Sequence, residues 1–207
     1  MDERGRIVAA GYDAVANEYA ALEQPGKEWP RLRLLRNVLT RIPPGATVLD
    51  LGCGNGVPAL VEIARSHEAV GVDLSETQAD LARANVPMAE VIQGDALELD
   101  FPSAMFGAVV ALYLFDHLPR DQHAALLGRI HDWLAPGGLL LFSLEPKDEA
   151  SSVRQWLSEP MFFSHFDAET TLRLVGEAGF EVLDAHRAPQ LEGATEVEFL
   201  WVTAKRD

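Results

Sequence analysis

Cysteine and long apolar runs are the scarcest features of this 207-residue chain. Its one cysteine, Cys53, excludes an internal disulfide and any metal site built from several cysteines. No two histidines are spaced as His-x-x-x-His, so the sequence predicts no metal site. No apolar run reaches the roughly 18 residues of a membrane helix, and we expect no membrane partner. Because Met1–Arg6 contains acids and leads into no apolar segment, we expect a cytoplasmic protein.

Basic residues are also few, with 17 Lys and Arg against 32 Asp and Glu, for a net charge of −15. Binding to a phosphate backbone depends on clustered Lys and Arg, so the charge argues against nucleic acid as a partner. We expect a monomer or homodimer. The one group of arginines comprises Arg31, Arg33, Arg36 and Arg41, which recur among leucines, and we interpret it as a solvated helix face.

Short apolar runs alternate with amphipathic stretches, which predicts βαβ units around a parallel sheet. We expect one α/β domain over 1–207, with a helical cap over 1–42. A turn at Pro189–Gly193 is too short for a crossover helix, so the last two strands should pair antiparallel. The predicted strands are 46–51, 69–73, 90–93, 107–113, 138–144, 180–187 and 196–204, and the predicted helices that follow the cap are 57–66, 76–84, 121–134 and 168–178.

The connection over 145–166 has no clean period, yet it is rich in aromatic residues. A long irregular connection in a compact domain is uncommon unless it has a function, so we interpret it as a substrate lid. Its Met161–Phe166 segment is expected to line an apolar acceptor pocket, to pack on the sheet, or both.

A glycine-rich turn follows the first predicted strand, with Gly52, Gly54 and Gly56 after Asp50. Such a turn lets the backbone approach a ligand, and the next helix offers N–H groups to an anion. Dinucleotide sites use G-x-G-x-x-G, whereas the spacing here is G-x-G-x-G. Asp50 can accept a hydrogen bond from an ammonium group.

Acids also end the next two strands, at Asp73 and Asp95. A carboxylate at the end of the second strand can accept from both hydroxyls of a ribose, and one after the third can accept from an adenine amino group. An aspartate after a strand is often only a turn residue. Their order at successive strand ends indicates a nucleoside ligand.

The run Asp50–Gly56 resembles the first motif, E/D-x-G-x-G-x-G, of class I S-adenosylmethionine-dependent methyltransferases of the small-molecule type. The resemblance implies S-adenosylmethionine as cofactor. It also implies a seven-stranded, mostly parallel Rossmann-like sheet with an antiparallel last strand, helices on both faces and an amino-terminal cap over the cofactor. The implied cofactor contacts are Tyr19, Asp50, Gly52, Gly54, Gly56, Asp73, Leu74, Asp95, Ala96 and Leu112.

Methyl transfer from a sulfonium is an in-line displacement, in which orientation can supply roughly 7–11 kcal/mol. A neutral amine needs no base, while a hydroxyl acceptor gains from proton removal. The candidate catalytic residues are Tyr12, His117 and His165. His117 follows the fourth strand, where such sheets bind ligands, and an ordinary histidine titrates in a suitable range. Its alternative role is packing at the strand end.

The expected function is therefore methyl transfer to O or N of a small-molecule acceptor. Two alternatives stay open. An NAD-linked oxidoreductase shares the glycine turn and Asp73, although none of Tyr12, Tyr19 and Tyr113 has a lysine four positions on. A fold that binds the cofactor without transferring methyl is the other, because fold does not fix function.

Overall fold

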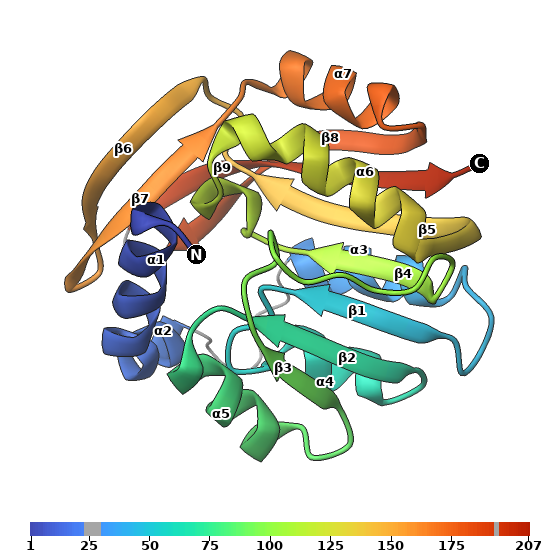
Figure 1. Cartoon of the computed structure of the whole chain (residues 1–207), viewed down its shortest axis with the longest axis horizontal. Coiled ribbons are helices and arrows are strands. Elements are labelled where there is room, and N and C mark those ends of the chain that lie inside the picture. The colour runs from blue at the N-terminus through green and yellow to red at the C-terminus, as the bar shows by residue number, and fades with distance from the viewer. Residues whose placement is uncertain (23–29, 193–194) are drawn as a thin grey trace.

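A central sheet of seven strands organises the structure, a computed structural model that describes residues 1–22, 30–192 and 195–207 (Figure 1). The strand order is β3-β2-β1-β4-β5-β9-β8. Its strands are β1 (Thr47–Leu51), β2 (Glu68–Asp73), β3 (Glu90–Gln93), β4 (Phe106–Ala111), β5 (Leu134–Leu144), β8 (Phe180–Glu192) and β9 (Thr195–Arg206).

Strands β1 to β5 run parallel, and β9 runs antiparallel between β5 and β8. The predicted mostly parallel sheet with an antiparallel last strand is confirmed. The strand order reverses between β1 and β4, which are paired with Leu49 beside Val109. In open α/β sheets, ligands bind outside the carboxyl ends of the strands at such a reversal.

The closing hairpin is longer than the sequence predicted. The predicted turn at Pro189 is wrong, because β8 continues to Glu192 and Pro189 pairs with Glu198. A proline cannot donate to a neighbouring strand, but β8 is an edge strand, where this is tolerated. Gly193, the last residue of the predicted turn, lies outside the described residues.

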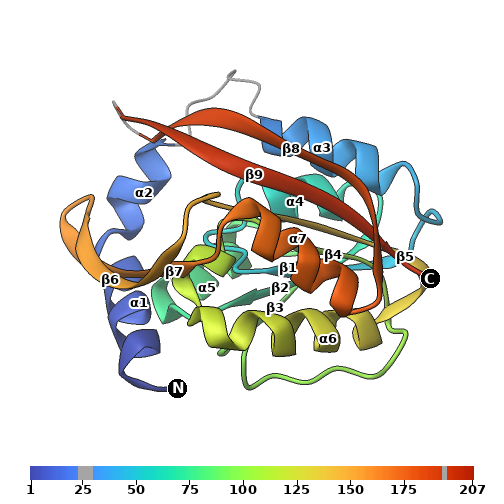
Figure 2. The ribbon, with the colours of Figure 1, turned by 90° about the horizontal axis from the view of Figure 1, so that it is seen from above.

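Helices cover both faces of the sheet, as predicted (Figure 2). One apolar cluster joins the sheet to α3, α4 and α5, and the other joins it to α6 and α7. None of the helices in the described ranges is long and apolar enough to cross a membrane. The helices are α1 (Glu3–Ala14), α2 (Ala16–Leu22), α3 (Pro30–Leu39), α4 (Ala59–Ala64), α5 (Glu76–Asn85), α6 (His123–Trp133) and α7 (Ala168–Glu177), with 3-10 turns η1 (Phe115–His117) and η2 (Arg120–Gln122).

Side-chain caps explain where two of these helices begin. The Ser75 side chain accepts a hydrogen bond from the backbone N–H of Gln78 at the start of α5. Asp167 accepts from the N–H of Thr170 at the start of α7, directly before the helix predicted over 168–178. Each cap satisfies a backbone donor that has no partner within its helix.

The connection over 145–166 is not irregular, which corrects the sequence-based expectation. It forms an antiparallel hairpin of β6 (Glu149–Trp156) and β7 (Glu159–His165), separate from the main sheet. The alternation typical of strands is hidden because every side chain from Met161 to His165 is buried. Helix α1 packs on this hairpin, with Val8 in one apolar cluster with Met161, Phe162 and Phe163.

Candidate functional site

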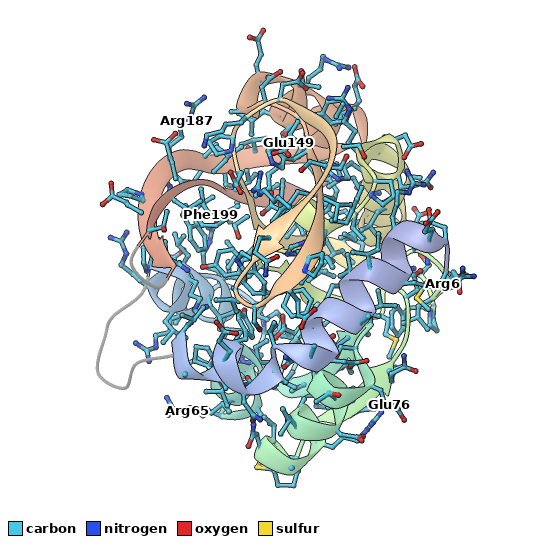
Figure 3. All side chains as sticks on the ribbon, turned by 90° about the vertical axis from the view of Figure 1, so that its left-hand side faces the viewer. Arg6, Arg65, Glu76, Glu149, Arg187 and Phe199 are labelled. Carbon is cyan, nitrogen blue, oxygen red and sulfur yellow. The ribbon has the colours of Figure 1, made fainter. Side chains whose placement is uncertain are left out.

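A cavity of about 260 Å³ lies between α1 and the carboxyl ends of the parallel strands. Figure 3 shows α1, which bears Arg6, crossing this end of the sheet beside the β6–β7 hairpin, which bears Glu149. Most of the predicted site residues come together here. Those that line the cavity are Tyr12, Tyr19, Gly52, Gly54, Asp73, Leu74, Asp95, Ala96, Leu112 and His117.

Three predicted residues lie elsewhere. Asp50 lines an adjoining pocket of about 40 Å³, together with Tyr19 and Arg31. Gly56 and His165 line neither space. The site therefore has a larger part under α1 and a smaller part beside the glycine turn.

The glycines of the turn serve different purposes. Gly52 and Gly54 have φ values of 72° and 54°, in a region that L side chains rarely adopt, and both border the cavity. At Gly56 (φ 80°), an added Cβ would lie 2.9 Å from a methyl carbon of Val86. Gly56 thus lets α5 pack closely against the turn and has no contact with the cavity.

Asp50 holds a buried carboxylate oxygen, Oδ2, that has no hydrogen-bond partner among the described residues. The residue is 2% exposed. Burial is the main cause that raises the pKa of Asp50 to about 7; repulsion by Asp73 adds to it and Arg31 opposes it. A buried carboxylate oxygen without a donor is costly, so this position fits an ammonium group in the smaller pocket.

Arg31 was expected on a solvated face, and the structure corrects this. It is 5% exposed, lines the smaller pocket and has its guanidinium carbon 5.9 Å from the ring centre of Tyr113. The sequence held a signal for this, because Arg31, Leu35 and Val38 share the spacing of one helix face and all three are buried. A guanidinium and a carboxylate thus border the same small pocket, an arrangement that fits a zwitterionic amino acid group.

Asp73 orders the turns on either side of the cavity. Its Oδ2 accepts from the N–H of Gly54 at 2.8 Å, and its Oδ1 accepts from the N–H of Ser75 at 2.9 Å. Burial raises the pKa of Asp73 to about 6, although these backbone hydrogen bonds oppose the shift. Asp95 holds its own loop in the same way, through a hydrogen bond from the N–H of Leu97.

Asp13 fastens α1 to α5, a role that the sequence did not indicate. Its Oδ1 accepts from the hydroxyl of Ser75 at 2.5 Å and from the N–H of Thr77 at 3.0 Å. These groups lie at the amino-terminal end of α5, where unpaired N–H groups and the helix dipole favour a carboxylate. The contact holds Tyr12, the preceding residue, over the cavity.

His117 and Tyr12 form a hydrogen-bonded pair that borders the cavity. The Nε2 atom of His117 lies 2.9 Å from the hydroxyl oxygen of Tyr12, and its Nδ1 lies 2.9 Å from the carbonyl oxygen of Phe162. Burial lowers the pKa of His117 to about 4, so the ring is neutral at neutral pH. The titration range on which the sequence argument for a base rested is therefore not found.

The other predicted residues of the lid connection lie outside the cavity. His165 is fully buried, with Nδ1 2.5 Å from the carbonyl oxygen of Lys147 and Nε2 3.4 Å from Glu149. The Met161–Phe166 segment does not line the cavity either. The segment packs, but against α1 and His117 and not on the main sheet as expected.

Tyr113 lines both pockets but was not predicted as a site residue. Its φ of 61° is rare for a residue other than glycine, and its hydroxyl donates to Gln190 at 2.5 Å. The closing hairpin is thereby joined to the end of β4.

Among the described residues, no group of three or more His, Cys, Asp or Glu side chains is arranged to hold a metal ion.

Comparisons with known proteins agree with this geometry. A family model described as a methyltransferase domain matches residues 48–138. An uncharacterized methyltransferase of Synechocystis sp. is 31% identical over 182 residues, which cover 84% of this chain and 84% of that protein. A probable S-adenosylmethionine-dependent methyltransferase of Mycolicibacterium smegmatis is 32% identical over 142 residues, or 68% of this chain and 54% of that protein.

Among solved structures, the Burkholderia thailandensis 1,6-didemethyltoxoflavin-N1-methyltransferase, bound to its named substrate and S-adenosylhomocysteine, superposes with a TM-score of 0.72. Its identity is 22%, and the match covers 99% of this chain and 89% of that one. This likeness shows the fold. The Synechocystis relative matches most of both chains at 31% identity, which shows the family. The chain is an enzyme of the S-adenosylmethionine-dependent methyltransferase family, and S-adenosylmethionine is its cofactor.

Proposed function

We propose that this enzyme transfers the methyl group of S-adenosylmethionine to O or N of a small-molecule acceptor by in-line displacement. The observation that carries the proposal is the buried Oδ2 of Asp50, which has no hydrogen-bond partner in the described part of the chain and lies in the pocket that adjoins the cavity under α1. The bound cofactor supplies a methyl group on a positively charged sulfur. The chain itself must bind the donor, exclude water and hold the acceptor in line, which is where most of the rate enhancement arises.

The residues of the two pockets fit the chemical groups of the donor. We assign the ammonium group to Asp50, and the carboxylate to Arg31 and the glycine turn around Gly52 and Gly54. Asp73 would accept from the ribose hydroxyls. Its Oδ2 already accepts from the N–H of Gly54, so this oxygen would accept from both groups or exchange one for the other. The adenine ring is assigned to the apolar end of the cavity, which is bordered by Leu74, Asp95, Ala96 and Leu112.

A small acceptor is favoured by the enclosure of the site. Donor and acceptor must share the space beneath α1, which leaves little room for a folded partner. The net charge of −15 disfavours nucleic acid. The Burkholderia neighbour, which has the same fold, is named for a small heterocyclic substrate. On the acceptor side we place Tyr12 and His117, and we assign His165 a structural role because it has no contact with the cavity.

Calorimetry with S-adenosylhomocysteine tests donor binding. We expect the wild-type enzyme to bind it and Asp50→Asn to bind at least about ten-fold more weakly, because a charge-assisted hydrogen bond contributes roughly 1.5–3 kcal/mol. Asp80→Asn is the matched control, since Asp80 is exposed on α5 and pairs with Arg83. Equal affinity in both variants would remove Asp50 from the donor site.

Labelled methyl donor and a panel of small amines, phenols and acids test the transfer itself. Transfer to a small molecule supports the proposal, and NMR of the product identifies the methylated atom. Binding of donor with no transfer across the panel would favour a cofactor-binding fold with another role. Transfer to a protein or RNA acceptor in place of small molecules would contradict the acceptor class.

A further inference from the structure

We propose that Tyr12 selects acceptors whose nucleophilic atom carries a hydrogen and arrives uncharged, a neutral primary or secondary amine, with His117 as its positioning residue. The inference rests on the proposed function and names the substrate class of the same site. It follows from the direction of two hydrogen bonds that connect the β6–β7 hairpin, η1 and α1.

The first bond fixes the proton on His117. The carbonyl oxygen of Phe162 in β7 can only accept, and it lies 2.9 Å from Nδ1 of His117. Nδ1 must therefore carry a hydrogen. The hairpin backbone thus sets the tautomer of a histidine that lies on a different element.

The second bond fixes the hydroxyl proton of Tyr12. His117 is 9% exposed, and its burial is the main effect that disfavours a positively charged ring. The nearby basic groups of Arg154 and His165 act in the same direction. In the neutral ring with hydrogen on Nδ1, Nε2 has a lone pair and can only accept. Tyr12 must then donate its hydroxyl hydrogen across the 2.9 Å to Nε2. To any other group, the Tyr12 oxygen offers only lone pairs.

Ring contacts hold this oxygen in place. The Tyr12 ring packs edge-on against His117 and Tyr19, at centroid distances of 5.4 and 5.6 Å, and against Trp156 at 5.4 Å. These three contacts favour the ring position in which the hydroxyl meets Nε2. Both Tyr12 and His117 border the cavity.

An oxygen that only accepts distinguishes acceptors. It accepts a hydrogen bond from an N–H or O–H group whose lone pair points at the methyl carbon, and it offers no such bond to a thioether or tertiary amine, which has no hydrogen on the attacking atom. The pair supplies no strong base, because His117 is buried and neutral, and a hydroxyl acceptor would need one. A neutral amine does not: its lone pair forms the N–CH3 bond as the S–CH3 bond breaks. Its N–H hydrogen stays on nitrogen until the methylated cation releases a proton to water.

NMR of protein with 15N-labelled histidine tests the hydrogen-bond chain without any acceptor. We expect His117 to show a protonated Nδ1 and an unprotonated Nε2 throughout about pH 6–8. Tyr12→Phe should move the Nε2 resonance and leave Nδ1 nearly unchanged, which a merely structural role for Tyr12 does not predict. A proton on Nε2, or a titration of His117 near neutrality, would overturn the proposal.

Matched probes test the selectivity on protein saturated with S-adenosylhomocysteine. In the wild type, we expect aniline to bind about five-fold more tightly than N,N-dimethylaniline, because one hydrogen bond contributes about that much to affinity. In Tyr12→Phe, the ratio of the two dissociation constants should be close to one. Equal binding in the wild type, stronger binding of dimethylaniline, or no binding of either would overturn the selectivity. If S-adenosylhomocysteine itself fails to bind, the proposed function is contradicted. The NMR measurement on Tyr12 and His117 needs no ligand, so it tests the hydrogen-bond chain independently.

Discussion

The Asp50 carboxylate is suited to a ligand at the expense of stability. In the unfolded chain an aspartate titrates near pH 4, and burial raises the pKa of Asp50 to about 7 in the folded protein. Between these values the folded state binds the proton more tightly, so the free energy of unfolding falls as the pH rises through this window. Above about pH 7 the loss is complete.

Asp50→Asn should therefore stabilise the enzyme without ligand. The gain should be close to zero near pH 4 and on the order of 4 kcal/mol above about pH 7. Urea unfolding of both proteins across this range measures the difference. Asp80→Asn, on the exposed face of α5, should give no such pH-dependent gain. A constant difference between wild type and Asp50→Asn at all pH values would contradict the assigned titration.

Gly56 and Gly45 separate steric crowding from backbone strain. Both have positive φ values, 80° and 75°, but an added Cβ meets Val86 at 2.9 Å only at Gly56 and meets nothing within 4 Å at Gly45. We expect Gly56→Ala to lose about 1–3 kcal/mol more stability than Gly45→Ala in thermal or urea unfolding. Because Gly56 borders no cavity, the folded variant should bind S-adenosylhomocysteine nearly as wild type does. A large loss of affinity with normal stability would reverse this assignment.

The sequence predicted which residues gather at the site better than what each one does. The glycine spacing and the acids at strand ends depend on local chain geometry, so Asp73 and Asp95 could be placed by pattern. The roles of Gly56 and Arg31 depend on how α5 and α3 pack, and no motif records packing. The low pKa of His117 likewise arises from burial under the hairpin, which only the fold reveals.

At the level of elements, Asp13 determines how α1 lies over the cavity. Asp13→Ala removes the carboxylate oxygen Oδ1 that accepts from the hydroxyl of Ser75 and from the N–H of Thr77 at the start of α5. We expect a loss of stability of about 1 kcal/mol, typical of a helix cap. We also expect faster amide exchange in α1 and faster dissociation of S-adenosylhomocysteine.

Hydrogen exchange by mass spectrometry and stopped-flow measurement of dissociation check this prediction. Glu18→Ala is the matched control, because Glu18 is an exposed acid on the neighbouring α2. Unchanged exchange in α1 of Asp13→Ala would contradict the prediction and mean that the apolar contacts with Met161 and Phe163 suffice to hold the helix.

The elements themselves were predictable to differing degrees. The strands of the parallel sheet follow from short apolar runs, since the central ones are buried on both faces. Helices α4 to α7 follow from apolar period and from turn residues, since each buries one recurring face. The β6–β7 hairpin escaped prediction because α1 buries one side of β7 and η1 borders it as well, so no polar face alternates along the strand. The extension of β8 through Pro189 depends on its place at the sheet edge, which sequence alone does not give.

At the level of the whole molecule, the net charge of −15 should affect donor binding. S-adenosylmethionine carries one net positive charge at neutral pH, whereas S-adenosylhomocysteine, which lacks the sulfonium charge, carries none. The field of an acidic protein attracts the cation over distances comparable to the Debye length, about 10 Å at 0.1 M salt and 3 Å at 1 M. The neutral product feels this field much less.

Raising the ionic strength from about 0.01 M to 1 M should therefore weaken binding of S-adenosylmethionine several-fold more than binding of S-adenosylhomocysteine. Calorimetry of both ligands in matched salt series measures the two slopes. The chain has 17 Lys and Arg against 32 acids, so removing surface acids lowers its negative charge. A variant in which four exposed acids are changed to their amides should therefore reduce the difference between the two slopes and keep the site intact. The four acids are Asp80, Glu181, Asp184 and Glu198. Equal slopes for the two ligands in the wild type would contradict the prediction and show that the surface charge does not act on the sulfonium.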